Sequence, residues 1–263
     1  LGMQKITDWR KFIKNSEKAS YTSVQDFIIT LNDLFSEHLK TLPPFPMKNV
    51  LIIHPLQGFF SPSFEQDFVQ RYYADFSEYL LTQINSAQKY FMDAQGFVET
   101  HLKFDAILCP FFLHWINDLP VFLNSLRKSL TPQGILMAAM LGGDSLRSLR
   151  DIFIQIELRK KNVKPHILPF CTPEHINRYL QHAGFAQWTI EEEQFSINYT
   201  SLRLLFQDMK NLGQSNALCT RFQGLTRSLH ASEIESLLKQ GDETFSVALD
   251  TFFMTGFNRS SAA

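Results

Sequence analysis

The sequence predicts an α/β fold built around a mostly parallel sheet. Short apolar runs alternate with helical patterns along most of the chain, and this alternation is typical of βαβ units. Several of the runs are continuously apolar, as in strands that helices cover on both faces. The clearest example lies in residues 104–146, which are predicted as strand, helix and strand, with polar groups where each strand ends.

The chain begins with a predicted pair of helices. Residues 8–40 carry apolar side chains at intervals of three and four, which is the helical period. Three prolines in residues 41–49 break this pattern, and the VLII run over residues 50–53 is predicted as a central strand. A Ser-Pro pair, which is a good helix start, predicts a helix over residues 61–74.

The rest of the chain continues the alternation of strands and helices. Asn117 and Asp118 are predicted to cap a helix, because their side chains can accept hydrogen bonds from exposed amides. Pro132 and Gly134 are predicted to turn the chain into a buried strand that ends at a pair of glycines. Further strands are predicted over residues 78–82, 88–92, 104–109 and 135–141, near Trp188 and over residues 245–257. Further helices are predicted over residues 117–130, 145–160, 173–183, 201–212 and 231–240.

Composition limits the classes of function. The chain has 263 residues, of which 44% are hydrophobic and 19% charged, and its formal net charge is -1, so we expect one soluble globular domain. This balance gives no electrostatic footprint for nucleic acid or for an anionic lipid surface. No apolar stretch is long enough to span a bilayer, and no secretory leader pattern opens the chain. We therefore expect a cytoplasmic protein, or one of an organelle matrix if the source is eukaryotic.

Cysteine and histidine usage predicts neither a metal site nor disulfides. Cys109, Cys171 and Cys219 are odd in number, far apart and without paired C-x-x-C spacing, so reduced thiols are expected. The eight histidines are scattered as well. Only His175 and His182 share a predicted helix face, and no thiolate or carboxylate is spaced to complete a zinc site with them.

Four segments carry a resemblance to a known family. They are HWINDLP at residues 114–120, LTPQGILMAAMLGGDSLRSLRD at 130–151, HAGF at 182–185 and LFQDMKNLGQSNAL at 205–218. In these segments the chain resembles the class I S-adenosylmethionine-dependent methyltransferases. Within that superfamily it is similar to the malonyl-acyl-carrier-protein O-methyltransferases of biotin synthesis and to the mitochondrial complex I assembly factor 5 family. The resemblance covers roughly residues 90–257.

The resemblance implies a Rossmann-like fold with a seven-stranded, mostly parallel sheet and helices on both faces. It also implies helical insertions after strands five and six. Residues 1–263 would form a single domain with a helical extension at 1–46, a cofactor-side half at 47–144 and an acceptor-side half at 145–263. S-adenosylmethionine would lie across the carboxyl ends of the strands, where the strand order reverses.

On this resemblance, residues 50–58 replace the family's first cofactor motif, an apolar strand with an acid and a glycine-rich loop. Ile52 stands where the acid is expected, and His54 and Leu56 stand at glycine positions, where a side chain resists positive φ. Gln83 would replace the acid that binds the ribose, which predicts a weakened cofactor site. The residues that the resemblance places at the cofactor are Ile53, His54, Gly58, Gln83, Asp93, Ala94 and Pro110, with Asp93 and Ala94 on the adenine side.

The acceptor side has three candidate catalytic residues, each with two open interpretations. His114 follows a strand, where it either acts as a general base or fills the rim of the pocket together with Trp115. Trp115 is also a candidate substrate-binding residue. Asp144 either points into the cleft or begins the next helix. Tyr199 either closes the acceptor pocket or packs against neighbouring apolar side chains. Arg147 and Arg150 are able to hold a substrate carboxylate bidentately or to form solvated surface, and we name both as candidate substrate-binding residues.

Two classes of function remain open from the sequence. The first is a methyltransferase that methylates a carboxylate on an acyl-carrier thioester, or another small or protein acceptor, chiefly by positioning it. The partner would then be an acyl-carrier protein or another protein. The second is a non-catalytic methyltransferase-fold binding or assembly factor that has lost cofactor binding. The assembly-factor resemblance also implies protein-arginine modification as an enzymatic variant.

Overall fold

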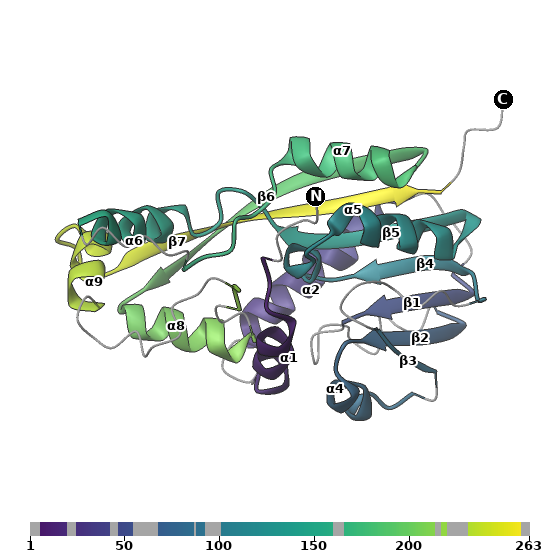
Figure 1. The fold of residues 1–263 in the computed structure, drawn as a ribbon, viewed down its shortest axis with the longest axis horizontal. Coiled ribbons are helices and arrows are strands. Elements are labelled where there is room, and N and C mark those ends of the chain that lie inside the picture. The colour runs from purple at the N-terminus through teal and green to yellow at the C-terminus, as the bar shows by residue number, and fades with distance from the viewer. Residues whose placement is uncertain are drawn as a thin grey trace. The chain divides into compact units, whose positions relative to one another are not determined.

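We describe the fold from a computed structural model of the chain. The described residues are 6–19, 25–42, 47–54, 68–86, 88–92, 101–159, 166–213, 217–219 and 231–258. Within them the strands form one seven-stranded sheet in the order β3-β2-β1-β4-β5-β7-β6 (Figure 1). The strands are β1 (Asn49–Ile53), β2 (Gln70–Asp75), β3 (Lys89–Phe91), β4 (Phe104–Cys109), β5 (Leu130–Leu141), β6 (Gln187–Tyr199) and β7 (Phe245–Phe257).

The pairing of the first five strands confirms the predicted α/β sheet. β1 pairs in parallel with β2 and β4, β2 with β3, and β4 with β5. The strand order therefore reverses between β1 and β4, which is where open parallel sheets place their ligands. The helices of the described chain are α1 (Trp9–Glu17), α2 (Gln25–Lys40), α4 (Glu78–Gln83), α5 (Leu119–Ser129), α6 (Arg147–Arg159), α7 (Pro173–Ala183), α8 (Leu202–Asn211) and α9 (Ala231–Lys239), with a 3₁₀ turn, η2, at Leu113–Trp115.

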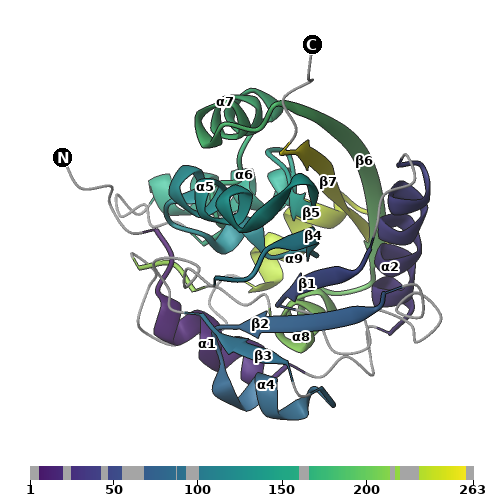
Figure 2. The ribbon, with the colours of Figure 1, turned by 90° about the vertical axis from the view of Figure 1, so that its right-hand side faces the viewer.

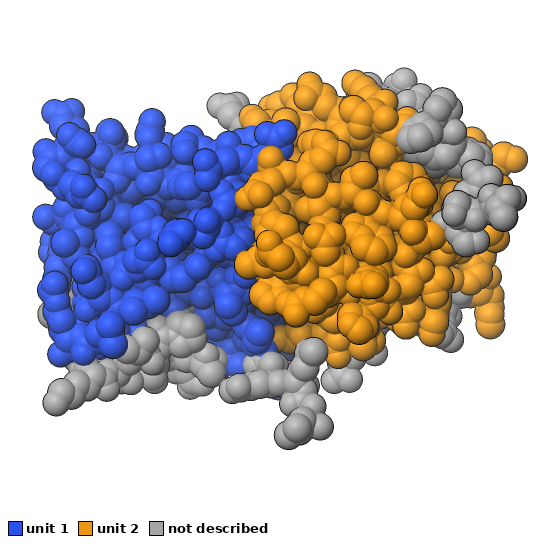
Figure 3. Space-filling model, turned by 90° about the horizontal axis from the view of Figure 1, so that it is seen from above, with its two compact units in different colours: residues 1–24, 141–170, 193–251 blue, residues 25–140, 171–192, 252–263 orange. Residues whose placement is uncertain are grey.

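The chain divides into two compact units, which are coloured separately in Figure 3. Unit 2 consists of residues 25–140, 171–192 and 252–263, and unit 1 of residues 1–24, 141–170 and 193–251. Unit 2 holds β1 to β4, nearly all of β5 and the helices α2, α4, α5 and α7. Unit 1 holds α1, α6, α8 and α9 and has its own buried cluster, which includes Leu149, Leu205 and Ile234. The single domain expected from the sequence stays a prediction.

Within unit 2, helices cover both faces of the strands. Figure 2 shows α5 and α7 on one side and α2 on the other. His38 of α2 lies 3.2 Å from the Glu191 carboxylate of β6, and its ring stacks on Phe253 of β7 at 4.2 Å. On the other side, Arg127 of α5 donates to the carbonyl of Ala183, the last residue of α7. Polar contacts as well as apolar packing thus hold the helices on each face of the sheet.

Most of the elements predicted from the sequence are confirmed. The N-terminal helical pair, the strands at 50–53, 88–92, 104–109 and 245–257, and the five later helices lie where the patterns placed them. The strand predicted at 135–141 is confirmed as part of β5, but the turn predicted at Pro132 and Gly134 is wrong, because β5 already begins at Leu130. Asp118 is the N-cap of α5 and accepts from the amide of Val121 at 3.2 Å. The strand near Trp188 is longer than predicted, since β6 runs from Gln187 to Tyr199.

Two predictions between β1 and β3 are wrong. Residues 70–74, placed in a helix, lie in strand β2, and residues 78–82, placed in a strand, lie in helix α4. Residues 61–67 of the predicted helix lie outside the described chain. Strand β2 forms because parallel pairing with β1 sets Tyr72 against Leu51, and tertiary pairing overrides local preference. Helix α4 forms because the Ser77 hydroxyl accepts from the amide of Leu80 at 3.2 Å.

None of the helices that the structure describes is long and apolar enough to cross a membrane.

Candidate functional site

The candidate site lies at the carboxyl ends of β1, β2 and β4. Parallel strands end at the same edge of a sheet, so the residues that follow them are brought together. Ile53, a fully buried core residue, ends β1 in register with Ala74 of β2. The next residue on each strand, His54 and Asp75, therefore meet although they are 21 positions apart.

His54 and Asp75 form a buried hydrogen-bonded pair. The His54 Nδ1 atom lies 2.9 Å from Asp75 Oδ2, and the backbone amide of His54 donates to the Ala74 carbonyl at 2.8 Å. The other carboxylate oxygen, Oδ1, accepts from the amide of Ser77 at 2.9 Å. His54 is 3% exposed and Asp75 is 1% exposed. Both carboxylate oxygens thus have protein donors, and water reaches neither side chain to any useful extent.

The backbone of His54 has the left-handed conformation that favours glycine. Its φ is 47°, and Phe111, just beyond the end of the neighbouring strand β4, has a φ of 45°. Such values cost a side-chain-bearing residue on the order of 1 kcal/mol, and they persist where the surrounding structure enforces them. The residue that follows β1 therefore has the backbone conformation of a glycine position, although it carries an imidazole.

Two phenylalanines enclose the pair. The Phe112 ring lies 5.1 Å from the His54 ring, and the Phe76 ring lies 6.4 Å from it, centroid to centroid. The two phenylalanine rings are themselves 4.7 Å apart, with exposures of 0% and 3%. In such apolar surroundings a hydrogen bond to a carboxylate is stronger than in water, and breaking it without replacement is costly. The two phenylalanine rings thus favour the hydrogen bond between His54 and Asp75 over its separation.

Asp75, and not Gln83, ends the second strand. Gln83 is the last residue of α4, is exposed, and donates through Nε2 to the Thr82 hydroxyl at 3.1 Å. The sequence-based placement of Gln83 failed because the second strand was assigned eight residues too late in the chain. Gly58, Asp93 and Ala94 lie outside the described residues.

A carboxylate at the end of the second strand has the chemistry to bind a ribose, because its oxygens can accept from two adjacent hydroxyls. In the described arrangement Asp75 is buried and has both oxygens engaged, and Phe76 and Phe112 pack against its partner His54. The described residues therefore do not fit a nucleoside as they stand. A ribose would have to displace the His54 ring from the carboxylate.

The residues after β4 are packed closely. Pro110 is buried directly after the strand, and His114 and Trp115 lie in the 3₁₀ turn with exposures of 9% and 4%. The amide of Trp115 donates to the Phe112 carbonyl at 3.0 Å, and the His114 and Trp115 rings lie 5.6 Å apart. This burial favours the interpretation that His114 and Trp115 fill the rim. Catalytic and substrate-binding roles for them stay predictions, as does a cofactor contact for Pro110.

Tyr199 lies in unit 1, where it packs in the core. It is 7% exposed, and its ring stacks on that of Phe245 at 6.0 Å. Burial raises the pKa of Tyr199, and the nearby Asp208 carboxylate, which accepts the hydrogen bond of the hydroxyl, raises it further. A phenol held this firmly in its protonated form is a poor base, so packing is the interpretation that the contacts favour.

The three charged candidates after β5 also belong to unit 1. Asp144 and Arg147 are both exposed and lie 3.3 Å apart as a local ion pair. Arg150 donates to the carbonyls of Gly143 at 3.3 Å and Ser145 at 2.8 Å, and its guanidinium lies over the Phe170 ring. Arg150 is committed to the turn that precedes α6, because the last carbonyls of that turn need donors. Its predicted role in holding a substrate carboxylate is therefore not supported by its contacts.

Sequence reasoning missed Asp75, Ser77 and Phe112. The signal for Asp75 was present, since the apolar run YYA is followed directly by an acid, as expected for a parallel strand that ends in a functional carboxylate. Among the described residues no group of three histidine, cysteine, aspartate or glutamate side chains is placed to hold a metal ion.

The sheet order and the reversal at β1 and β4 define a Rossmann-like class I methyltransferase fold. The chain belongs to the methyltransferase domain family, whose model matches residues 34–190. S-adenosylmethionine is the cofactor of this family. Among solved structures, the chain is similar in fold to the YcgJ protein from Bacillus subtilis, with a TM-score of 0.55, 11% identity and coverage of 86% of this chain and 97% of that chain.

Curated relatives match part of the chain. A protein of Rickettsia prowazekii (strain Madrid E), named as a methyltransferase, is 34% identical over 145 residues, which are 55% of this chain and 64% of the relative. The human mitochondrial arginine-hydroxylase NDUFAF5 is 30% identical over 158 residues, 59% of this chain and 46% of the relative. The malonyl-[acyl-carrier protein] O-methyltransferase of Gallionella capsiferriformans (strain ES-2) is 34% identical over 113 residues, which are 43% of this chain and 37% of the relative. The chain thus spans less than two thirds of the length of each.

Proposed function

We propose that this member of the methyltransferase family acts chiefly by binding a partner protein, and that it binds S-adenosylmethionine only weakly. The observation that carries the proposal is the buried contact of His54 with Asp75. The carboxylate that would accept the ribose hydroxyls already has two donors, so the cofactor must replace a charge-assisted hydrogen bond before it gains its own. Methyl transfer would be slow for the same reason.

The relatives support a role with a protein partner. The malonyl-[acyl-carrier protein] O-methyltransferases among them are named for a group on a carrier protein, and the mitochondrial arginine-hydroxylases are named for arginine, a residue that proteins contain. We therefore propose a protein as the partner of this chain, in the cytoplasm or in an organelle matrix, as the mitochondrial names of several relatives suggest. Arginine modification of that partner is one form that the interaction would take.

A second candidate is methylation of a carboxylate on an acyl-carrier thioester. The similarity to the malonyl-[acyl-carrier protein] enzymes favours it, and such a reaction needs little acid-base assistance because a carboxylate is already nucleophilic. The contacts of Arg150 with the carbonyls of Gly143 and Ser145 count against it, since a substrate carboxylate would have to compete with them for the terminal nitrogens, although the buried Nε has no partner among the described residues.

Titration calorimetry with S-adenosylhomocysteine on the wild-type chain tests the proposal. The loss of one hydrogen bond to a charged group, about 1.5 to 3 kcal/mol, weakens binding roughly 10-fold to 150-fold. From a starting point of about 1 µM, we therefore expect a Kd of about 10 to 150 µM. Transfer of a methyl group to malonyl-acyl-carrier protein, seen as a mass increase of one methylene unit, would favour the second candidate. A Kd near 1 µM would refute weak cofactor binding.

A further inference from the structure

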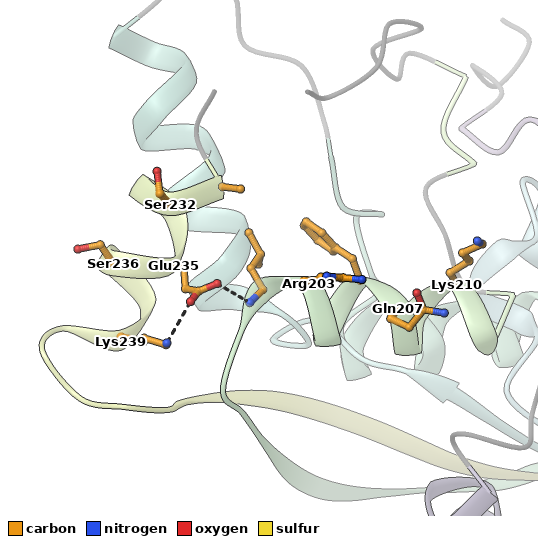
Figure 4. A pocket seen from close by; sticks show the side chains of 10 residues that line it. Arg203, Gln207, Lys210, Ser232, Glu235, Ser236 and Lys239 are labelled. Carbon is orange, nitrogen blue, oxygen red and sulfur yellow. Dashed lines mark hydrogen bonds and ion pairs between the residues drawn. The ribbon is translucent and has the colours of Figure 1, made fainter. Parts of the chain in front are cut away.

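Unit 1 has a hollow of about 790 Å³ between α8 and α9, shown in Figure 4. All of the residues that line it come from these two helices, and none belongs to the candidate cofactor site. Leu202 and Phe206 of α8 contribute apolar surface, while Arg203, Lys210 and Lys239 contribute cations. The hollow thus combines an apolar floor with a basic edge.

The wall formed by α8 is a regular stripe. Arg203, Phe206, Gln207 and Lys210 are spaced i, i+3, i+4 and i+7, so they share one face of the helix. On another face Leu205 is buried in the core of unit 1. The core contact of Leu205 holds α8 in place, and the side chains of the stripe line the hollow. Phe206, in the middle of the stripe, leaves 43% of its surface exposed.

The wall formed by α9 has the same spacing. Ser232, Glu235, Ser236 and Lys239 occupy i, i+3, i+4 and i+7, and Ile234 faces the core. The Glu235 carboxylate accepts from the amide of Leu202 at 2.9 Å and from Lys239 at 3.0 Å (Figure 4). These two hydrogen bonds, the first to the backbone, lower the pKa of Glu235. The Glu235 carboxylate therefore already has hydrogen-bond donors on both oxygens.

The remaining charge on the wall is positive. Within the described part of the chain, neither Arg203 nor Lys210 has a carboxylate partner, and both are exposed. The chain segments next in sequence do not supply one. Residues 160–165, 214–216 and 220–230 contain three lysines and two arginines, with no aspartate or glutamate. Within the described residues, the cations of the hollow thus remain available to an anionic ligand.

We propose that this hollow docks an amphipathic helix of the partner protein, with a carboxylate at each end of an apolar patch. Arg203 and Lys210 are seven residues apart, about 10 Å along α8, which is two helical turns. A docked helix with acids at i and i+7 would match this spacing, and an apolar residue at i+3 or i+4 would meet Phe206. The inference rests on the proposed role in binding a partner and adds where that partner docks and what its chemistry is.

A fluorescently labelled helical peptide of about 18 residues provides the probe, because it spans the stripe with turns to spare. The first peptide carries glutamates at i and i+7 and leucines at i+3 and i+4, a second has lysines in place of those glutamates, and a third moves the glutamates to the opposite face. We expect the first to bind the full chain with a Kd of roughly 10 to 100 µM. The second and third should bind at least about tenfold more weakly, and added salt should weaken the first.

Paired charge reversals locate the contact. In R203E/K210E the affinity for the first peptide should fall at least about tenfold, and in Phe206→Ala it should fall several-fold. The matched control is R10E/K14E, the same change of charge on the exposed face of α1 in the same unit, which should leave the affinity within about twofold. Circular dichroism checks that each variant is folded.

Three results would overturn this inference. They are equal binding of the acidic and basic peptides, unchanged binding in R203E/K210E, and displacement of the peptide by millimolar inorganic phosphate, which would assign the hollow to a small anion. The assay contains no S-adenosylmethionine, so its outcome is separate from that of the cofactor titration. Tight cofactor binding together with peptide binding would refute only the proposal of a weak cofactor site. Weak cofactor binding without peptide binding would refute only the docking site.

Discussion

Replacement of Phe112 with alanine is expected to lower the free energy of unfolding by about 3 to 5 kcal/mol. The side chain is fully buried, and its ring packs against three others: His54 at 5.1 Å, Phe76 at 4.7 Å and Phe122 at 6.2 Å. Truncation removes this apolar contact and opens a cavity beside a buried hydrogen-bonded pair. Urea denaturation followed by circular dichroism measures the change.

The matched control for Phe112→Ala is Val121→Ala in α5. Val121 is 50% exposed, so its truncation should change the stability by no more than about 0.5 kcal/mol. A loss below about 1.5 kcal/mol in Phe112→Ala would mean that the ring is not enclosed and that the site after β4 is open to solvent. Such a result would mean that the His54–Asp75 hydrogen bond is not shielded from water by apolar side chains.

Replacement of Asp75 with alanine is expected to cost about 2 to 4 kcal/mol of stability. The substitution leaves two buried donors without an acceptor, the His54 ring and the Ser77 amide, and each loses a hydrogen bond of 2.9 Å to a carboxylate oxygen. Asp75→Asn should cost less, because one amide oxygen remains as an acceptor. Thermal and urea denaturation of both variants measure the difference.

A double-mutant cycle makes the prediction for Asp75 specific. If the pair is formed as described, Asp75→Ala should cost less in a His54→Gly background than in the wild type, since one of the two orphaned donors is then gone. Additive effects of the two substitutions, or an Asp75→Ala variant as stable as the wild type, would argue against the buried contact. Each single variant serves as a reference for the other.

The sequence placed the continuously apolar strands and missed β2, whose first residues are polar and exposed. The runs at 50–53 and 135–141 are continuously apolar, and 104–109 is nearly so, and they were assigned to strands correctly, although β5 begins five residues before its apolar run. Strand β2 begins with exposed Gln70 and Arg71 and becomes buried only from Tyr72 onward. A short, mixed run of this kind fits a helix as well as a strand, and only the register with β1 decides between them.

The candidate site was half predictable. The sequence singled out His54 because a side chain stood where the family has glycine, and the backbone there does have positive φ. It could not name Asp75 as the partner, since a contact between residues 21 apart depends on the strand register. It also could not show that Arg150 is used by the carbonyls of Gly143 and Ser145, because those acceptors become available only in the folded turn.

The affinity of His54→Gly for S-adenosylhomocysteine tests the central claim most directly. Glycine keeps the left-handed turn and frees one oxygen of Asp75, so the Kd measured by titration calorimetry should be at least about tenfold lower than in the wild type, which corresponds to about 1.4 kcal/mol. The gain should disappear in H54G/D75A, where the carboxylate itself is gone. An unchanged Kd in a folded His54→Gly variant would contradict the claim that His54 holds the ribose-binding carboxylate.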